Sequence, residues 1–446
     1  MSDVMLDQVT NTPAVEAPHQ PRSWLSPLNR RRLANFRANR RARWSLWIFA
    51  VLFGLSLLAE FIANDKPILV RYQGEFRMPI FQFYSEQDFG GDFRTEAAYK
   101  DPEVQCLIRT GGLADPCFDD PFGTMEAVEA GTFEAEGFQP GWALWPPIPY
   151  RFDTIVDRPG VAPGPPNVIG WYQTGEIGPD GEPEWKWGLL PKDQRGQNLL
   201  GTDNTKRDVL ARVIYGFRVS VLFALLVTVA SSLIGIVAGA VQGYFGGWTD
   251  LLFQRFIEIW TGIPSLYVII IMTAILGKSF LLIAILTILF GWPALVGLVR
   301  AEFLRARNFE YVRAARALGV SDTRIMFRHV LPNAMVATIT MLPFLITGGI
   351  ATLASLDFLG FGLPSSAPSL GELTLQAKQN LQAPWLGFTA FITFAVMLSL
   401  LVFIFEGVRD AFDPRKTFVA APDSVVPDVE DAEAEAALAA RATGRP

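Results

Sequence analysis

The sequence predicts an all-α membrane protein with six transmembrane helices and a large extracytoplasmic insert, partly β, between the first two helices. Half of the 446 residues are hydrophobic and only 18% are charged, which is typical of membrane proteins. Six apolar runs reach about the 20 residues that a helix needs to cross a bilayer. Residues 64–208 separate the first run from the other five, and that is far longer than an ordinary connection.

The six apolar runs cover residues 44–63, 219–241, 256–276, 280–299, 334–356 and 386–405. Core helices of a soluble protein would be shorter and would show an amphipathic stripe. Glycine and proline inside these runs are tolerated in membranes, where neighbouring helices satisfy the freed backbone groups. The first run follows a long basic flank and no small-residue cleavage site comes after it, so we interpret it as a retained anchor.

Arginine clusters predict the orientation of the chain. Residues 1–43 form a basic amino-terminal segment that carries Arg30, Arg31, Arg32, Arg37, Arg40, Arg41 and Arg43. The connection between the fourth and fifth runs carries Arg300, Arg305, Arg307, Arg313, Arg316, Arg324 and Arg328. Arginine near helix ends stays in the cytoplasm, so both clusters and, after six crossings, the carboxy terminus are expected there. A contact of the first cluster with anionic lipid is a weaker alternative.

The insert, residues 64–208, is rich in Pro, Gly, Trp and acidic residues. Short strand patterns at 67–84, 166–175 and 184–190 lie between turn signals and predict a small β-rich module with long loops. Cys106 and Cys117 are the only cysteines, and they lie on the oxidising side of the membrane in this topology. A disulfide closing a short loop and two free thiols both remain open.

The last two segments complete the domain organisation. Residues 209–414 are predicted to form the transmembrane domain, with a cytoplasmic connection at 301–332. Residues 415–446 are acidic, Ala-rich and poor in aromatic residues, a composition that predicts a disordered cytoplasmic tail.

The sequence contains no pattern of residues that indicates an enzymatic function. His19 and His329 are the only histidines, and neither has a cysteine or carboxylate at metal-ligand spacing. The "GKS" at residues 277–279 lacks the earlier glycine of a phosphate-binding loop, and the "GFG" at 360–362 lacks the third glycine of a dinucleotide turn. We therefore expect no catalytic residue, no metal site, no cofactor and no nucleic-acid partner.

An ion-coupled carrier would be expected to hold ionisable groups at membrane depth. Glu258 is the main candidate within a span, with Arg255 near it, and no inverted repeat with paired broken segments is visible. Coupling to a cytoplasmic motor is therefore the preferred hypothesis. An ion-coupled carrier or channel acting alone is the alternative, and a sensor or enzyme domain anchored by the spans is a third.

The basic connection has an unusual pattern. Residues 301–318 have good helix propensity, and Gly319 ends that helix. A second short helix is expected to begin with Ser321 as its cap and to stop near Pro332, where the fifth span would start. Three small residues offer a face that a partner's groove can approach closely: Ala314, Ala315 and Ala317.

This pattern resembles the signature loop of permease subunits in ABC importers, which is Glu-Ala-Ala, three residues, Gly, nine residues and Ile-x-Leu-Pro. Here Arg313 replaces the family's glutamate and His329 its isoleucine, as in the peptide-importing branch. The resemblance places the contact with the ATPase on Arg313, Ala314, Ala315, Leu318, Gly319, Leu331 and Pro332.

Two further stretches are similar to that branch. One begins at Leu200, before the second span, and the other at Leu356, between the last two spans; Lys206 stands in the first where a glycine is common. The resemblance implies the MetI-like fold of type I importers in a bacterial inner membrane. It also implies a second homologous permease, two cytoplasmic ATP-binding subunits, an extracytoplasmic peptide-binding protein and surrounding membrane lipid as partners.

The same resemblance implies alternating access, with ATP-driven movement passed through residues 314–319. Peptides or peptide-like compounds such as microcin C would be the substrates. Helices two to five would line the path, with Ser231, Ser232, Glu258, Gly348 and Gly349 as candidates, although close helix packing is the simpler role for the small residues. The insert would either dock the binding protein or serve a structural role.

Overall fold

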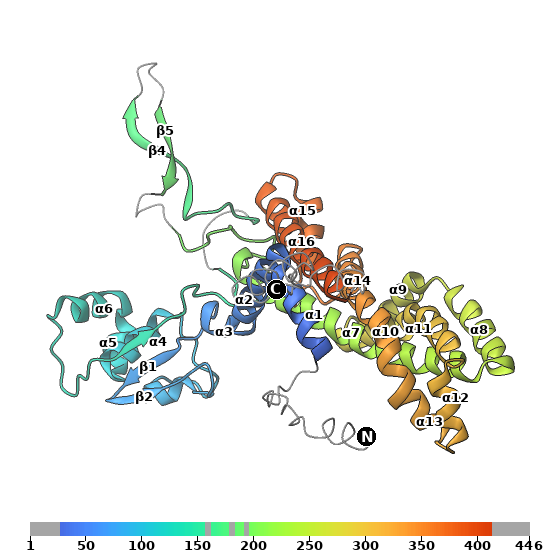
Figure 1. The fold of residues 1–446 in the computed structure, drawn as a ribbon. Helices are drawn as coiled ribbons and strands as arrows, with labels where there is room; N and C mark the ends of the chain where they lie inside the picture. Colours follow the sequence, from blue (N-terminus) through green and yellow to red (C-terminus); the bar gives the residue numbers. More distant parts are fainter. Residues whose placement is uncertain (1–26, 157–161, 178–182, 191–195, 413–446) are drawn as a thin grey trace, which may run out of the picture. The chain divides into compact units, whose positions relative to one another are not determined.

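The computed structural model describes residues 27–156, 162–177, 183–190 and 196–412, and Figure 1 labels their helices and strands. Three predicted features lie outside the described residues. They are the tail 415–446, His19, and the part of the basic amino-terminal segment that precedes Pro27. The chain divides into two compact units, residues 1–43 with 407–446 and residues 44–406.

The smaller unit contains α1 (Pro27–Ala38), the start of α2 (Arg40–Leu57) and the end of α16 (Pro384–Phe412). The guanidinium of Arg32 lies 4.5 Å from the centroid of the Phe412 ring, a cation–π contact. Gly407 faces the methyl group of Ala42 so closely that a side chain would collide with it. The unit is therefore packed through its own side chains.

In the described part of the chain, four helices are long and apolar enough to cross a membrane: Val209–Phe245, Phe280–Ala306, Asp322–Phe358 and Pro384–Phe412. A fifth crossing is counted if the bent pair α8 (Gly247–Thr261) and α9 (Ser265–Leu276) is one span. The predicted first run forms α2, a break at Leu58 and α3 (Ala59–Ile62). It is not among the four, since α2 has only 18 residues and three of them are arginines.

The predicted span at 256–276 is bent within its length. Its two halves, α8 and α9, meet at an angle of 63°. Pro264 has no backbone N–H and lies at the cap of α9 with extended ψ, so an uninterrupted helical hydrogen-bond ladder cannot pass through it.

The helix α7 (Val209–Phe245) is the centre of the larger unit, and its 37 residues span about 55 Å. Three of its glycines, four residues apart, face α11 (Pro293–Ala306), which follows α10 (Phe280–Gly291). A Cβ at Gly235, Gly239 or Gly243 would lie 2.5, 2.8 or 2.5 Å from a carbonyl oxygen of α11 or the residue before it. Small residues at this spacing let membrane helices approach backbone to backbone.

The remaining membrane helices pack on α7 as well. The helix α14 (Leu331–Phe358) contacts α7 where Gly349 meets the backbone of Ala224. The short helix α15 (Leu370–Gln379) and α16 supply buried side chains to the same core as α7, among them Leu370, Leu386 and Met397. One apolar core therefore joins elements from distant parts of this unit's sequence.

The insert is mixed α/β, and the prediction of a β-rich module is wrong for residues 102–130. A three-stranded antiparallel sheet of order β2-β1-β3 is formed by β1 (Leu69–Tyr72), β2 (Glu75–Arg77) and β3 (Trp142–Leu144). The one-turn helix η1 (Glu86–Phe89) follows β2. The predicted strands at 166–175 and 184–190 are confirmed as the antiparallel hairpin β4 (Ile169–Ile177) and β5 (Pro183–Leu189).

Three helices of the insert were not predicted from the strand patterns: α4 (Pro102–Thr110), α5 (Ala114–Asp119) and α6 (Pro121–Ala130). Prolines stand in the first turn of α4 and α6, and Gly111 and Gly131 end them with left-handed φ values of 78° and 73°. These are ordinary helix start and stop signals. The sequence therefore contains start and stop signals for α4 and α6, but the strand patterns on either side of them favoured the prediction of a β-rich module.

Candidate functional site

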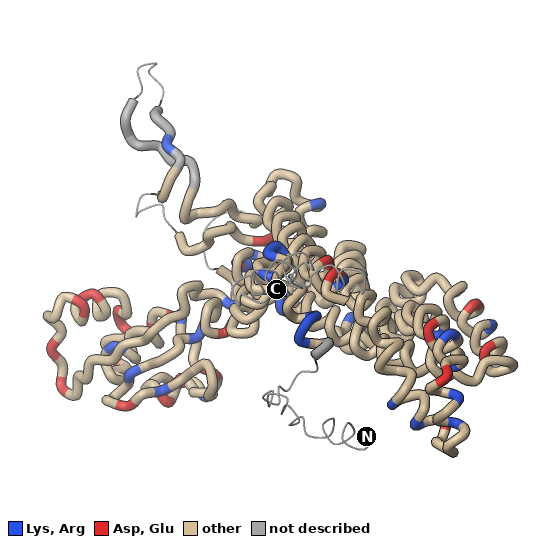
Figure 2. Tube along the Cα trace, in the orientation of Figure 1, with Lys and Arg blue, Asp and Glu red and all other residues tan. Residues whose placement is uncertain are grey.

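The segment after α11 forms a short helical excursion that we call the α12–η2 segment, residues 307–330. It contains α12 (Glu310–Ala317), α13 (Asp322–Arg324) and the π-helical turn η2 (Ile325–Val330). The uninterrupted helix expected over 301–318 is wrong, because Arg307, Asn308 and Phe309 separate α11 from α12. Figure 2 shows basic residues, in blue, recurring along this segment, and all of them are arginines.

One apolar contact fixes α12. Val312 is fully buried among Phe303 of α11, Ile325 and Met326 of η2 and other members of one apolar cluster. Burying a valine side chain contributes about 1.5–3 kcal/mol. Since α12 has only eight residues and would not be stable alone, this contact holds it on the membrane helices.

A polar contact joins α12 and α13 to the end of α7. The Tyr244 hydroxyl donates to Asp322 Oδ1 at 2.5 Å and accepts from Arg316 Nε at 3.3 Å. The Arg316 guanidinium also lies 4.9 Å from the centroid of the Tyr244 ring. One tyrosine therefore links α7 to both short helices.

Gly319 ends α12, as predicted. Its φ is +74°, a left-handed value that costs a residue with a Cβ roughly 1–2 kcal/mol. Its N–H donates to the Arg316 carbonyl at 2.9 Å, and the Val320 N–H donates to the Ala315 carbonyl at 3.1 Å. A Cβ at Gly319 would meet no atom within 4 Å, so backbone conformation alone selects glycine there.

The separate short helix expected to stop near Pro332 is wrong. The helix continues from Asp322 to Phe358, and Pro332 stands in the first turn of α14, where a missing N–H is tolerated. A π-helical turn shifts the hydrogen-bond partners by one residue, and it ends at Val330, two residues before the proline. Ser321 stands at the predicted cap position, but its side chain makes no capping hydrogen bond.

The family-signature residues occupy different environments. Arg313, Ala314 and Ala317 are exposed on α12, whereas Ala315 and Leu331 are half-buried against the Val312 cluster. Pro332 is exposed on the first turn of α14. Leu318, directly after α12, is 83% exposed.

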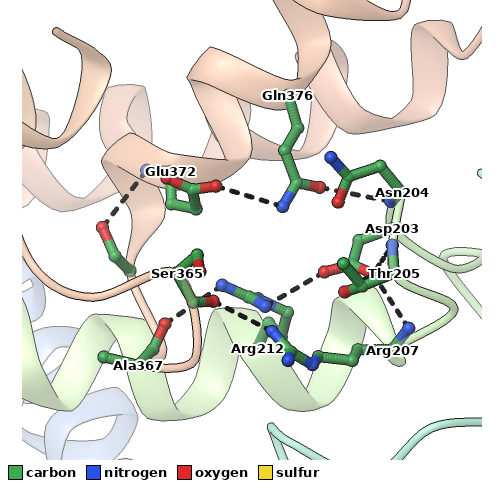
Figure 3. A network of polar contacts seen from close by, with 10 residues as sticks. Asp203, Asn204, Thr205, Arg207, Arg212, Ser365, Ala367, Glu372 and Gln376 are labelled. Carbon is green, nitrogen blue, oxygen red and sulfur yellow. Dashed lines mark hydrogen bonds and ion pairs between the residues drawn. The ribbon is translucent and has the colours of Figure 1, made fainter. Parts of the chain in front are cut away.

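A second group of polar residues lies at the opposite end of α7, where Figure 3 shows the contacts. Asp203 and Arg212 form a fully buried ion pair with an N–O distance of 3.0 Å. The Arg212 guanidinium also donates to the Ala367 carbonyl at 3.0 Å. Breaking a buried pair of this kind is strongly destabilising, since one charge is left without a partner.

This polar junction brings together the two other family-like stretches. Arg207 donates to the Ser365 carbonyl at 2.9 Å, and the Asn204 N–H donates to Gln376 at 3.3 Å. Asp357, at the end of α14, accepts from the Leu363 N–H at 2.6 Å and from the Ser369 hydroxyl. Residues 200–212 and 356–376 are thus one structural unit, which their separation in the sequence did not reveal.

Lys206 departs from the family's glycine at a position with φ of +60°. That backbone region favours glycine. The surrounding turn holds the conformation, because Asp203 Oδ1 accepts from the backbone N–H groups of Thr205 and Arg207 at 2.8 and 2.9 Å. The departure is therefore tolerated at a local cost in backbone strain.

The candidate path residues do not form one cluster of contacts. Ser231 and Ser232 are buried on α7, and no hydrogen-bond partner among the described residues satisfies their hydroxyls. Gly349 packs on Ala224, whereas a Cβ at Gly348 would meet open space. Glu258 is exposed on α8 and pairs with Arg255 at 2.5 Å, which is an ordinary surface ion pair.

The two cysteines of the insert lie close together. Cys106 on α4 and Cys117 on α5 are joined by a disulfide, with Cα atoms 5.4 Å apart. In the ranges that the structure describes, no group of three His, Cys, Asp or Glu side chains is arranged to hold a metal ion.

Comparison with known proteins adds the following similarities. Residues 231–418 match the family model described as binding-protein-dependent transport system inner membrane component. The peptidoglycan transport system permease protein YejE of Agrobacterium fabrum is 52% identical over 93% of this chain and 99% of its own length. The inner membrane ABC transporter permease protein YejE of Escherichia coli is 50% identical over 88% of this chain and 99% of its own.

A more distant relative shares only part of the chain. The oligopeptide transport system permease protein OppC of Lactococcus lactis is 35% identical over 49% of this chain and 76% of its own length. The similarity to the two YejE proteins therefore extends well beyond the part that this OppC shares.

Proposed function

This chain belongs to the inner-membrane permeases of binding-protein-dependent ABC importers, and we propose that it carries peptides or peptide-like compounds across a bacterial inner membrane. Permeases of this family are not catalytic, since a separate ATP-binding subunit hydrolyses ATP and a binding protein delivers the substrate. The names of the YejE and OppC relatives supply the peptide and peptidoglycan classes. Microcin C remains a predicted peptide-like substrate.

The α12–η2 segment is proposed to receive the ATP-binding subunit. The observation that carries this proposal is the combination of an anchored helix and an exposed apolar tip. Val312 fixes α12 to the membrane helices, while Leu318 is 83% exposed beside Arg313 and Ala314. If a groove of the ATP-binding subunit covers Leu318, movement of that subunit would move α12 as a rigid body. The Tyr244 contact would then transmit the movement to α7.

The arrangement in the membrane is proposed as six crossings with both termini in the cytoplasm. Residues 44–63 would form the first crossing, with the break at Leu58 near its outer end, and α8 with α9 would form the third. The seven arginines within residues 30–43 and the seven within residues 300–328 support this orientation. The insert 64–208 then faces outward, where a disulfide between Cys106 and Cys117 is stable.

The complete transporter is proposed to contain a second homologous permease and two ATP-binding subunits, surrounded by lipid. The path would run along α7 and α14, where Ser231, Ser232, Gly348 and Gly349 lie. Gly348 is the strongest of these candidates, since a Cβ there meets open space and helix packing does not explain the glycine. The insert is proposed to receive the peptide-binding protein.

Leu318→Asp tests the proposal. The chain is reconstituted in proteoliposomes with its co-expressed ATP-binding subunits, second permease and binding protein, and ATP-dependent uptake of a labelled tripeptide is measured. An aspartate at this exposed position should leave folding intact and reduce uptake and peptide-stimulated ATP hydrolysis at least about tenfold, since a charge is placed in an apolar contact.

Leu381→Asp is the matched control, because Leu381 is 84% exposed but lies in the turn before α16. It should keep normal uptake. Normal uptake by Leu318→Asp would remove this segment from the mechanism. Uptake by the wild-type chain without any ATP-binding subunit would favour the ion-coupled carrier instead.

A further inference from the structure

A large cleft in the insert has no role in the function proposed above. Its volume is about 1160 Å³, which exceeds the roughly 300–1,000 Å³ typical of small-molecule sites. Three stretches of chain line it, residues 65–66, 96–105 and 145–155, together with Val168 and Gln197. The cleft therefore has room for several residues of a peptide.

One wall of the cleft is apolar and stiff. Residues 145–150 read Trp-Pro-Pro-Ile-Pro-Tyr, and five of these six line the cleft. Proline restricts its own φ and the conformation of the residue before it, so this wall loses little conformational freedom when a ligand packs on it. Trp145 and Tyr150 add flat surfaces that suit an apolar side chain.

Lys100 is the unusual charge in the cleft. Its ammonium lies 3.4 Å from the centroid of the Tyr150 ring, a cation–π contact. Among the described residues, no carboxylate forms an ion pair with it. Burial lowers the pKa of Lys100 to about 8, although the negative charges of Asp65 and Asp208 act in the opposite direction.

The other charged groups of the cleft are either paired or acidic. Lys66 is paired with Glu96. Asp65 accepts from the Thr154 hydroxyl at 2.8 Å through one oxygen, and its other oxygen is buried without a partner in the described part of the chain. Asp101 also lines the cleft and is exposed. Among the described residues that line the cleft, Lys100 is thus the cation that remains for a ligand anion.

We propose that this cleft binds the carboxylate terminus of a short peptide, with the Lys100 ammonium facing the carboxylate and Trp145 and the prolines contacting the last side chain. The peptide class rests on the proposed function. A ligand carboxylate would give Lys100 the direct ion pair that no carboxylate of the described residues forms with it, and a charge-assisted hydrogen bond of this kind is among the stronger polar contacts. The insert then becomes a second peptide site outside the transmembrane path.

The test uses the full-length chain in nanodiscs of phosphatidylcholine and phosphatidylglycerol. Binding of N-acetyl-Ala-Ala-Phe with a free carboxylate is compared by calorimetry with binding of its carboxamide. At pH 7 the acid should bind at least about tenfold more tightly, and Lys100→Gln should remove that preference. Because Lys100 must be protonated, the preference should fall as the pH rises from about 7 to about 9, through the lysine's pKa of about 8.

Lys378→Gln is the matched control. Lys378 also lies over an aromatic ring, 5.1 Å from the centroid of Phe358, but it does not line the cleft. This variant should keep the full preference for the acid. Thermal unfolding of Lys100→Gln should occur at or above the wild-type temperature, because the substitution removes a half-buried charge without an ion-pair partner among the described residues.

Equal binding of acid and amide, or an unchanged preference in Lys100→Gln, would overturn the proposal. Uptake measurements separate this result from a failure of the proposed function. If ATP-driven peptide uptake persists while acid and amide bind equally, the cleft proposal falls and the importer function stands. If acid-selective binding persists without ATP-driven uptake, the importer function falls and the carboxylate site stands.

Discussion

Gly319 shows how one residue controls the proposed contact with the ATP-binding subunit. Its φ of +74° lets the chain turn from α12 into α13. Since no neighbouring atom crowds the position, a substitution acts through backbone strain alone. The sequence pattern predicted this glycine correctly as a helix stop.

Gly319→Val should therefore reduce ATP-dependent uptake strongly while membrane insertion is retained, since a β-branched residue resists left-handed φ by roughly 1–2 kcal/mol. Gly319→Asn should keep most of the uptake, because asparagine tolerates this conformation. Uptake and protease sensitivity of residues 307–330 would be measured together. Equal activity of the two variants would show that the left-handed turn is unimportant.

The Asp203–Arg212 pair is the residue-scale feature that the sequence did not predict. Both side chains are fully buried. The pair also supports the turn at Lys206, since the same aspartate accepts the hydrogen bonds of that turn. Mutation of one residue can measure what the pair contributes to stability, because the other charge is then left buried without its partner.

Arg212→Met should lower the free energy of unfolding by about 3–5 kcal/mol, since the Asp203 carboxylate stays buried without its counter-charge. Arg255→Met is the control, because its pair with Glu258 has side chains that are 76% and 47% exposed and should contribute less than about 1 kcal/mol. Thermal unfolding in detergent would compare them. If Arg212→Met and Arg255→Met both lower the free energy of unfolding by a similar, small amount, water must reach the Asp203 carboxylate.

At the scale of elements, the packing of α7 on α11 positions the proposed coupling segment. Gly235, Gly239 and Gly243 place the two backbones in contact. The chain then leaves α11 toward α12, whose anchor Val312 packs on Phe303 of α11. The spacing of the glycines in the sequence permits such packing, but the partner helix cannot be identified from spacing alone.

Gly239→Val should destabilise the protein by about 1–3 kcal/mol, since its Cβ would lie 2.8 Å from the Val296 carbonyl oxygen. Gly297→Val on α11 is the control, because no atom lies within 4 Å of a Cβ there. Both substitutions add the same atoms to an apolar helix. A comparable loss of thermal stability in the two variants would argue against close backbone packing at Gly239.

At the scale of the whole molecule, the proposed topology places the insert and the α12–η2 segment on opposite sides of the membrane. Phe122 on α6 and Leu318 are both exposed, at 68% and 83%, so each suits a labelling experiment. The chain has only two cysteines, and their replacement by serine provides a background for single reporters.

In that background, Phe122→Cys should react with an impermeant maleimide in intact spheroplasts, whereas Leu318→Cys should react only after lysis. The arginine distribution is the physical reason for this orientation. Labelling yield on a gel is the measurement. Reaction of Leu318→Cys alone in intact spheroplasts would invert the topology, and reaction of both would contradict an odd number of crossings between them.

The sequence by itself determined the membrane class, most of the apolar helices, the hairpin strands and Gly319 as a helix end. These features depend on local composition, periodicity and backbone preference. Tertiary structure decided the bend at Pro264, the continuous helix through Pro332, the helices of the insert and the joining of residues 200–212 with 356–376. Those outcomes depend on contacts between residues that are distant in the sequence, such as Arg212 with Ala367. Local sequence patterns do not predict which distant groups will form a buried hydrogen bond, because that depends on how the helices pack.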